Sequence, residues 1–262
     1  MEIGAETRAV VTGAGKGIGR AIAEALIARG ARVGLIARSG DELEALAGEL
    51  GDRASPHPAD VGDRDAITRA VSSFVDDAGG LELLVANAGI ARYAPISEQD
   101  PEDADAMVRT NVLGTINTVR ASLDPMLDRG RGHVVVVSSA AALRAWPWGA
   151  VYGATKAANK GFAEALRHEL SGTGVSVTTV FPGEVSTEIH AEADRLPDWR
   201  QSDREIAAAD VAEATLAAVE ADRREVHIPR QVRLLALNDL APGLVDRLLA
   251  SVRGGAAAPR RY

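Results

Sequence analysis

The chain has 262 residues, of which 46% are hydrophobic and 25% charged, a balance typical of one large α/β domain with enough material for a core. There is no cysteine, which excludes disulfides and thiolate metal sites, and the formal charge of −8 argues against general affinity for nucleic acid or an anionic membrane. Because no apolar run is long enough to span a bilayer and the first residues do not resemble a signal peptide, we expect a cytoplasmic protein without stable membrane insertion.

The first expected strand, Arg8–Thr12, runs into a glycine-rich turn and then into a helix that continues to about Ile27. The turn reads Thr12-Gly13-Ala14-Gly15-Lys16-Gly17-Ile18-Gly19. A phosphate-binding loop requires this context, because glycine lets a pyrophosphate approach the backbone and the helix N-terminus offers free N–H groups. The spacing differs from Gly-x-Gly-x-x-Gly, and glycines that merely form a turn remain an alternative.

A second strand, Arg32–Ala37, ends at Arg38, where dinucleotide-binding folds place a residue against the adenosine ribose. An acidic residue there would favour NAD(H), whereas an arginine accommodates a 2′-phosphate and favours NADP(H). Lys16 in the glycine turn could add a second cation to the same phosphate. The alternative is that Arg38 is a solvated loop charge.

The following segment predicts an amphipathic helix at Asp41–Leu50 and a short third strand within Arg53–Val61. Asp63 is the expected N-cap of the next helix, which runs to about Val75. Asp60 stands at the end of the third strand, and its carboxylate could accept a hydrogen bond from an adenine amino group.

The stretch Leu81–Ala86 is almost wholly apolar, as expected for a strand of a buried parallel sheet, and it ends at Asn87-Ala88-Gly89. The stretch Pro101–Leu127 has a helical pattern and carries Asn111 near its middle. Pro125 within this stretch predicts a kink or an early end of the helix.

The strongest strand signal is His133–Val137, with four consecutive valines, and it runs directly into Ser138 and Ser139. Because neighbouring residues of a strand face opposite sides, only one of the two serines should face a site at the strand end, and we favour Ser139. A helix is expected at Val151–Leu170.

Tyr152 and Lys156 are four residues apart on that helix, which places both side chains on one face. An ordinary tyrosine has a pKa of about 10. A lysine ammonium beside it favours the phenolate and lowers that pKa, which would give a proton donor and acceptor that works near neutral pH. The alternative for this pair is an exposed helical face without function.

The remaining elements are a strand at Val175–Phe181 that ends at Pro182-Gly183, a helix at Ile206–Ala221 and a last strand at Glu225–Ile228. Strands alternate with helices throughout, so we predict an α/β fold: a doubly wound, Rossmann-like parallel sheet with helices on both faces. A single domain is expected over residues 1–262, with 188–210 as a candidate substrate lid and 230–262 as a C-terminal extension.

In their order along the chain, these motifs resemble the classical short-chain dehydrogenase/reductase family from Arg8 to about Ile228. The matching pieces are Thr12–Gly19, Asp60-Val61, Asn87-Ala88-Gly89, Asn111, Ser139, Tyr152-x-x-x-Lys156 and Pro182-Gly183-x-x-x-Thr187. The resemblance implies an oxidoreductase that transfers a hydride between a nicotinamide and a carbonyl or secondary alcohol. With Arg38 and Lys16, the expected cofactor is NADP(H) rather than NAD(H).

The resemblance also implies roles for single residues. Tyr152 would be the general acid/base, Ser139 would bind the reacting oxygen, and Lys156 would bind the nicotinamide ribose and lower the pKa of the tyrosine. Asn111 would hold a water that links Lys156 to solvent. The implied cofactor-binding residues are Thr12, Gly13, Gly15, Lys16, Gly17, Ile18, Gly19, Arg38, Asp60, Val61, Asn87, Ala88, Gly89, Tyr152, Lys156, Pro182, Gly183, Val185 and Thr187.

The substrate is less well specified. The chain has only nine aromatic residues, of which Tyr93, Trp146, Trp148 and Trp199 lie in segments that follow strands, where ligands bind in open α/β sheets. They suggest a bulky apolar carbonyl or alcohol, with ordinary loop packing as the alternative. The leucines after Ile228 predict a segment that packs on its own subunit, on a neighbouring subunit or loosely on a membrane.

Other functions were weighed against this interpretation. No two of the five histidines stand at metal-binding spacing, so no metal site is expected. A catalytically silent nucleotide-binding member of the family, or a dehydratase or epimerase on the same fold, remains an alternative. The family is often dimeric or tetrameric through the Pro101–Leu127 and Val151–Leu170 helices, so we expect a homodimer or homotetramer.

Overall fold

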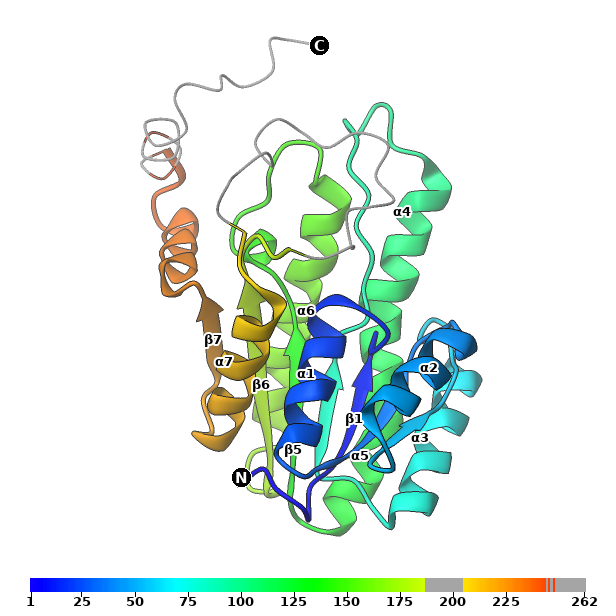
Figure 1. Ribbon diagram of the computed structural model, residues 1–262. Coiled ribbons are helices and arrows are strands. Elements are labelled where there is room, and N and C mark those ends of the chain that lie inside the picture. The colour runs from blue at the N-terminus through cyan, green and yellow to red at the C-terminus, as the bar shows by residue number, and fades with distance from the viewer. Residues whose placement is uncertain (187–204, 244, 246, 248–262) are drawn as a thin grey trace.

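The computed structural model of the protein describes residues 1–186, 205–243, 245 and 247. In these residues seven parallel strands form one sheet in the order β3-β2-β1-β4-β5-β6-β7 (Figure 1). The predicted doubly wound parallel sheet is therefore confirmed. The strands are β1 (Arg8–Thr12), β2 (Arg32–Ile36), β3 (Ala54–Pro56), β4 (Leu83–Ala86), β5 (Gly132–Val137), β6 (Val175–Pro182) and β7 (Glu225–Ile228).

Helices cover both faces of the sheet. Successive strand residues point to opposite sides, so each buried strand contributes apolar side chains to both faces. In β1, Ala9 and Val11 join the apolar cluster under α1 (Gly17–Ala28), α2 (Gly40–Leu50) and α7 (Ala208–Glu220), whereas Val10 joins the cluster on the other face. That second cluster includes residues of α3 (Arg64–Ala78), α5 (Gly114–Asp128) and α6 (Ala150–Glu169). Both faces of the sheet are thus buried, which explains the nearly continuous apolar runs of its strands.

The order of the strands reverses between β1 and β4. The chain moves from β1 outward through β2 and β3, and then returns to the other side of β1 to form β4, β5, β6 and β7. The segments that follow β1 and β4 therefore diverge at the carboxyl edge of the sheet and leave a crevice there, the usual ligand site of such folds. The glycine turn follows β1, and Asn87 follows β4.

The predicted Pro101–Leu127 helix is a composite. It consists of α4 (Pro101–Met107), a π-helical turn η1 (Val108–Leu113) and α5, which together form one continuous run of helical backbone. Of the two alternatives at Pro125, a kink or an early end, the early end is wrong, because α5 continues through Pro125 to Asp128. One proline in the last turn removes a single backbone hydrogen bond, and the adjacent Met126 is fully buried against Gly132, so packing outweighs that loss.

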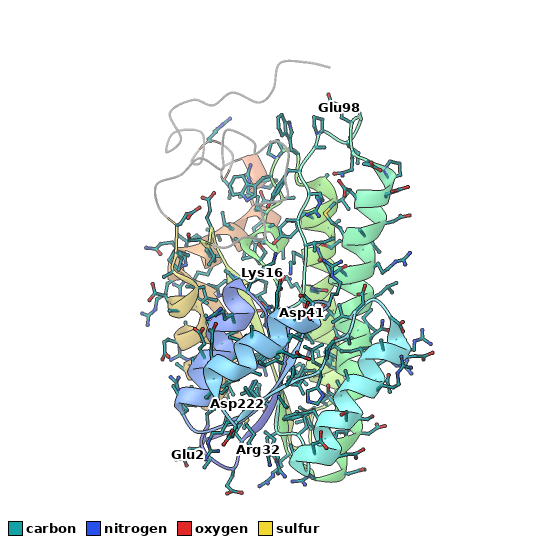
Figure 2. The ribbon with its side chains drawn as sticks, turned by 45° about the vertical axis from the view of Figure 1, so that its right-hand side comes forward. Glu2, Lys16, Arg32, Asp41, Glu98 and Asp222 are labelled. Carbon is teal, nitrogen blue, oxygen red and sulfur yellow. The ribbon has the colours of Figure 1, made fainter. Side chains whose placement is uncertain are left out.

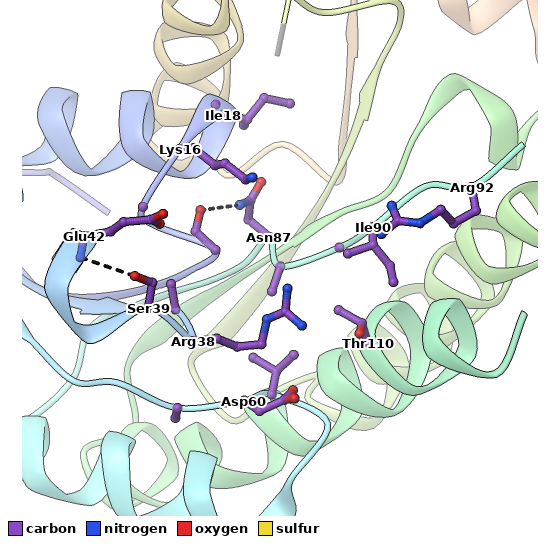
Figure 3. A pocket seen from close by; sticks show the side chains of 18 residues that line it. Lys16, Ile18, Arg38, Ser39, Glu42, Asp60, Asn87, Ile90, Arg92 and Thr110 are labelled. Carbon is purple, nitrogen blue, oxygen red and sulfur yellow. Dashed lines mark hydrogen bonds between the residues drawn. The ribbon is translucent and has the colours of Figure 1, made fainter. Parts of the chain in front are cut away.

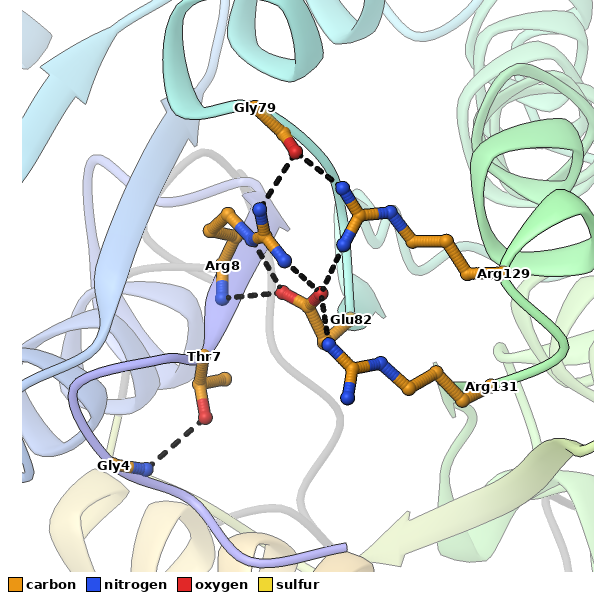
Figure 4. Close-up of polar contacts among 7 residues, drawn as sticks. All are labelled: Gly4, Thr7, Arg8, Gly79, Glu82, Arg129 and Arg131. Atoms are coloured by element: carbon orange, nitrogen blue, oxygen red, sulfur yellow. Dashed lines mark hydrogen bonds and ion pairs between the residues drawn. The ribbon is translucent and has the colours of Figure 1, made fainter.

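At the amino edge of the sheet a carboxylate is enclosed by arginines (Figure 4). Glu82 accepts hydrogen bonds from the backbone N–H and side chain of Arg8 and from Arg129, and it lies 3.6 Å from Arg131. Burial alone would raise the pKa of Glu82, but the hydrogen bonds and charge of Arg8, together with Arg129, hold it below its ordinary value. This cluster joins β1, β4 and the turn before β5 at the edge opposite the crevice.

Charged side chains lie on the outside of the molecule at both ends of the sheet. Figure 2 shows Arg32 and Asp222 in the lower part of the view, at the amino edge, whereas Lys16 lies higher, near the middle of the view. In the part of the chain that the structure describes, no helix has the length and apolar character needed to cross a bilayer. Of the candidate lid, residues 188–204 lie outside the described residues and 208–210 form the first turn of α7.

The chain after β7 forms a 3₁₀ helix, η5 (Arg230–Asp239). Val232 on η5 packs with Leu143 and with Phe181 of β6, and Leu235 is partly buried against them. Figure 1 shows this orange segment at the edge of the molecule, beyond the carboxyl end of β7. The C-terminal extension therefore begins with η5, which packs against Leu143 and the end of β6.

Candidate active site

The glycine turn after β1 approaches the backbone of α1 too closely for side chains. Gly13 and Gly17 have φ of +65° and +57°, values that L residues rarely adopt. A Cβ placed on Gly19 would lie 2.1 Å from the carbonyl oxygen of Gly13 and 2.6 Å from Nδ2 of Asn87. Only glycine fits there, so the N-terminus of α1 stays open to a phosphate group.

Thr12 and Asn87 join the ends of β1 and β4 across the crevice. The side-chain amide of Asn87 donates to the carbonyl of Thr12 at 2.9 Å, and its backbone N–H donates to Oγ1 of Thr12 at 3.0 Å. Oγ1 of Thr12 in turn donates to the carbonyl of Val85 at 3.4 Å. The predicted cofactor residues Thr12 and Asn87 therefore form the floor that holds the two strand ends together.

A cavity of about 330 Å³ opens above this floor (Figure 3). It brings together the predicted residues Gly13, Gly15, Lys16, Gly17, Ile18, Arg38, Asp60, Val61, Asn87, Ala88 and Gly89. Residues that were not predicted from the sequence also line the cavity, namely Ala37, Ser39, Glu42, Ala59, Ile90, Arg92 and Thr110. These belong to strand ends and loops whose side chains meet only in the folded protein.

One wall of the cavity combines opposite charges. In Figure 3 the Arg38 side chain reaches into the cavity between Asp60 and Asn87, and Glu42 comes from the first turn of α2. Glu42 Oε2 would lie 3.3 Å from a Cβ on Gly15, so its carboxylate faces the glycine turn. Ser39 caps α2 by accepting from the backbone N–H of Glu42 at 3.4 Å. The Ser39-x-x-Glu42 spacing of a capping box is the signal that could have placed Glu42 here.

Lys156 is the most deeply buried cation of the site, with an exposed fraction of 3%. Its Nζ donates to the carbonyl of Val137 at 3.1 Å and lies 5.9 Å from the ring centre of Tyr152. A Cβ on Gly89 would lie 3.3 Å from the same Nζ, so the lysine reaches the loop that lines the cavity. Burial lowers the pKa of Lys156 from 10.5 to about 8.

The ring of Tyr152 packs against a second tyrosine. Tyr93 is buried, and its ring makes an edge contact with Tyr152 at 5.9 Å between centres. Tyr93 also lies close to Gly149, one residue before α6. Tyr93, predicted as a substrate residue, thus lies beside Tyr152, where its ring restricts the orientation of the Tyr152 ring.

Asn111 lies in the π-helical turn and is fully buried. Its Oδ1 accepts from the backbone N–H of Ile90 at 2.8 Å, and its Nδ2 donates to the carbonyl of Ile90 and to Oγ1 of Thr155, each at 2.9 Å. Thr155 donates to the carbonyl of Tyr152 at 2.7 Å. The side chain thus connects the loop after β4 to the helix turn that carries Tyr152 and Lys156.

The two serines after β5 have different surroundings. Ser138 is buried and donates to the backbone carbonyl of Lys156 at 2.8 Å. Ser139 is half-buried at the start of the 3₁₀ turn η2 (Ala140–Ala142), where its Oγ accepts from the N–H of Ala141 at 3.1 Å. Ser138 therefore fixes α6 to the end of β5, whereas the side chain of Ser139 caps the turn η2.

The other predicted residues that the structure describes do not line the cavity. Trp146 and Trp148 are half-buried, Arg144 lies 5.1 Å from the Trp146 ring, and the Trp148 carbonyl accepts from Ala94 at 3.0 Å. Gly183, after Pro182 at the end of β6, donates to the carbonyl of Ile228 at 2.7 Å, and Val185 pairs with Ile206. Thr187 and Trp199 lie outside the described residues.

The described residues contain no group of three or more His, Asp or Glu side chains suited to a metal ion. His133 shows a structural role instead: burial lowers its pKa to about 4, and its Nε2 lies 2.7 Å from Oγ1 of Thr178. Since Thr178 already donates to the carbonyl of Arg223, the neutral His133 donates to Thr178.

Comparison with known proteins identifies related chains. A family model described as short chain dehydrogenase matches residues 7–197. An uncharacterized oxidoreductase of Staphylococcus aureus (strain MW2) is 35% identical over 213 residues, which cover 80% of this chain and 90% of that protein.

Two solved structures are also similar. A short chain dehydrogenase/reductase of Burkholderia phymatum in complex with NAD has a TM-score of 0.84 at 25% identity and covers 94% of this chain and 97% of that chain. An alcohol dehydrogenase of the archaeon Thermococcus sibiricus complexed with 5-hydroxy-NADP has a TM-score of 0.76 at 28% identity, covering 84% and 95%.

We expect Lys156→Met to raise the free energy of unfolding at pH 7 by about 1–2 kcal/mol. Below pH 8 the folded protein carries the full cost of the buried ammonium, and the lost hydrogen bond to Val137 offsets part of the gain. Between pH 8 and 10.5 the unfolded chain binds more protons than the folded chain, so the wild-type protein gains stability with rising pH. The difference in the free energy of unfolding between Lys156→Met and the wild type should therefore decrease from pH 8 to pH 10.5. Urea unfolding without cofactor measures it.

Lys160→Met is the matched control, one turn further along α6. Its ammonium lies 4.0 Å from Glu164 and is partly exposed, so we expect a change below about 0.5 kcal/mol at either pH. If Lys156→Met has a lower free energy of unfolding than the wild type at pH 7, burial of the charged Lys156 does not destabilise the fold and the prediction is wrong.

Proposed function

Because the chain belongs to the short-chain dehydrogenase family, we propose that it is a cytoplasmic NADP(H)-dependent oxidoreductase that transfers a hydride between the nicotinamide and a carbonyl or secondary alcohol. The observation that supports this reaction most is the buried Lys156, which lies 5.9 Å from the Tyr152 ring and beside the cavity residue Gly89. The NAD and 5-hydroxy-NADP bound to the Burkholderia and Thermococcus proteins support a nicotinamide cofactor.

The residues present fit such a dinucleotide. The bare backbone at Gly13, Gly17 and Gly19 suits a pyrophosphate, because any Cβ on Gly19 would fill the space beside Gly13. Asp60 and Val61 line the same cavity and would hold the adenine, while Gly183 and Val185 would meet the nicotinamide end. When bound, the nicotinamide supplies or accepts the hydride.

The side chains supply the proton and stabilise the reacting oxygen. Tyr152 donates a proton to the oxygen during reduction and takes it back during oxidation. The Oγ of Ser139 already accepts from Ala141, so its hydroxyl hydrogen can be donated to the same oxygen. Two donors aimed at one oxygen stabilise the negative charge that develops on it.

Lys156 gives Tyr152 the electrostatic environment that a general acid/base needs. With a pKa of about 8, the lysine is mostly protonated at pH 7 despite its burial. Its positive charge favours the phenolate, and its remaining N–H groups can bind a ribose hydroxyl. The Val137 carbonyl fixes the direction of the ammonium.

We propose that Asn111 acts first as a positioning residue. Its hydrogen bonds to Ile90 and Thr155 hold the cavity loop and the Tyr152 turn at a fixed separation. The water that would link Lys156 to solvent at Asn111 remains part of the proposal. The π-helical turn supports it, because such turns shift backbone carbonyls out of the regular hydrogen-bond pattern.

We expect Tyr152→Phe to lower kcat by about 10³-fold or more, because the phenol oxygen is the only group removed. Cofactor affinity, measured by fluorescence titration of the reduced cofactor, should remain within about threefold of the wild type. A Tyr152→Phe enzyme that keeps its turnover would refute the proposed acid/base.

The charges in the cavity support a preference for NADP(H). Arg38 and Lys16 are two cations at the wall where a 2′-phosphate would lie, whereas Glu42 is one carboxylate near the same wall. Because the phosphate carries close to two negative charges, two cations outweigh the repulsion from Glu42. Glu42 could accept from a ribose hydroxyl instead, which limits the discrimination between the two cofactors.

We expect Arg38→Ala to lower kcat/KM for NADPH by about 10- to 100-fold, because one charge-assisted phosphate contact is lost. The value for NADH should change little. Arg32→Ala, an exposed arginine at the opposite edge of the sheet, is the matched control and should leave both values unchanged. Steady-state comparison in which wild-type protein uses NADH better than NADPH would overturn the preference.

We propose a bulky apolar substrate. The support is the half-buried Trp146 and Trp148 in the segment between β5 and α6, together with the apolar face of Tyr93 beside Tyr152. Arg144 stacks on Trp146 and adds one cation to this wall. An apolar substrate with a single polar group would match these side chains.

A panel of ketones and secondary alcohols, followed by absorbance of the reduced cofactor, tests this proposal. We expect kcat/KM for aryl and long-chain ketones to exceed that for small polar carbonyls by about tenfold or more, because each buried methylene adds binding energy. Turnover confined to small polar carbonyls would contradict it.

We also propose that the protein is a homodimer or homotetramer. Val108 and Leu113 are large exposed apolar residues on the Pro101–Leu127 run, which is the segment expected to form the contact. Exposed apolar side chains on adjacent helical turns support a surface that another copy covers.

A further inference from the structure

The 3₁₀ helix η5 has three distinct faces. A 3₁₀ helix has three residues per turn, so every third residue lies in one row along the helix. Val232 and Leu235 form the row that packs on Leu143 and Phe181. Leu234, Leu237 and Leu240 form the next row, where Leu240 directly follows the helix and donates from its N–H to the carbonyl of Leu237. We call this row the leucine ridge.

The leucine ridge faces solvent. Its three side chains are 54%, 49% and 83% exposed, and Leu240 is the most exposed large apolar residue of the described chain. Three large apolar residues in line are not the scattered exposed residues that every protein surface shows. The ridge is therefore a candidate docking surface.

The surroundings of the ridge are basic. Arg230 and Arg233 are exposed on the neighbouring row of η5, and Arg247 is exposed further along. Among the described residues from 229 onward there are three arginines and one aspartate, Asp239, a local charge of +2 in a chain whose formal charge is −8. Since screening limits exposed charges to roughly 8 Å at physiological salt, the arginines rather than the acidic remainder set the potential at the ridge.

We propose that the leucine ridge and its arginines form a docking surface for an anionic lipid bilayer. The leucines would enter the boundary between headgroups and acyl chains, and Arg230 and Arg233 would meet the lipid phosphates. This surface association does not require a spanning helix. It places positive charge and apolar surface side by side, which is the combination that peripheral membrane segments use.

A second copy of the chain fits the ridge less well. In a twofold contact the arginines of one copy would face those of the other, and like charges at an interface are unfavourable. Three partly exposed leucines also offer less area than the roughly 800 Å² per partner of a standard protein interface. A bilayer can bind a small apolar and basic surface without shape complementarity.

The position of η5 connects the docking surface to the mouth of the site. Val232, on the buried row, would lie 3.4 Å from a Cβ on Gly183, and it packs on Leu143 in the segment after Ser139. A bilayer at the ridge would therefore lie at the carboxyl edge of the sheet. An apolar substrate could reach the site from the lipid phase without crossing bulk water.

Flotation of the full-length protein with vesicles tests the proposal without cofactor or substrate, so the result does not depend on the proposed reaction. Vesicles of phosphatidylcholine with about 30 mol % phosphatidylglycerol provide the anionic surface, and pure phosphatidylcholine provides the neutral one. We expect binding to the anionic vesicles and weaker binding to the neutral ones. Raising the salt from about 0.1 M to 0.5 M should reduce the binding.

Variants separate the two contributions. Leu240→Gln should lower the partition coefficient onto anionic vesicles by about tenfold. The double variant Arg230→Gln/Arg233→Gln should lower it by roughly fivefold for each arginine that is replaced. Leu127→Gln, a leucine 38% exposed at the end of α5, and Arg32→Gln are matched controls at the amino edge and should bind like the wild type. Circular dichroism and thermal unfolding confirm that each variant is folded.

Three outcomes would overturn the proposal. The first is wild-type protein that stays unbound to anionic vesicles at low salt. The second is a loss of binding in the arginine variant while Leu240→Gln binds normally, since charge alone would then hold the protein. The third is a change in the sedimentation coefficient of Leu240→Gln with unchanged vesicle binding, which would assign the ridge to contact between subunits.

Discussion

The buried ammonium of Lys156 is the interaction on which the arrangement of the site depends. It donates to the carbonyl of Val137 at the end of β5, approaches Gly89 after β4, and lies one helical turn from Tyr152. A cation in this position has a lowered pKa and costs stability, because the protein interior solvates it less well than water does. The surrounding backbone must be fixed firmly enough to keep the lysine from turning outward.

Polar side chains with several partners provide that rigidity. Asn87 and Thr12 tie β1 to β4, Asn111 ties the loop after β4 to the turn of α6, and Ser138 ties α6 to the end of β5. Each of these groups bonds to backbone that comes from a different strand or helix. The site is therefore an assembly of strand ends held at fixed distances, and the Glu82 cluster fixes the same strands at the opposite edge.

Much of this could be predicted from the sequence where the signal is local. The valines of β5 and the apolar run of β4 predict buried strands, and Asp63 caps α3 as expected, accepting from Asp65 and Ala66. Ile90, Arg92 and Thr110 were missed as cavity residues because nothing in their own neighbourhoods marks them; strands far apart in sequence bring them together. The early helix end expected at Pro125 did not occur, because the packing of Met126 outweighs the backbone hydrogen bond that the proline removes.

The sequence by itself determined the order of strands and helices, the glycine turn and the spacing of Tyr152 and Lys156, since each depends on residues within a few positions of one another. Only the tertiary structure decided that Lys156 is buried, that Tyr93 packs on Tyr152, and that the leucines of η5 divide into a buried row and an exposed one. Burial, pKa and exposure are properties of long-range contacts. No pattern along the chain specifies them until the sheet and its helices have come together.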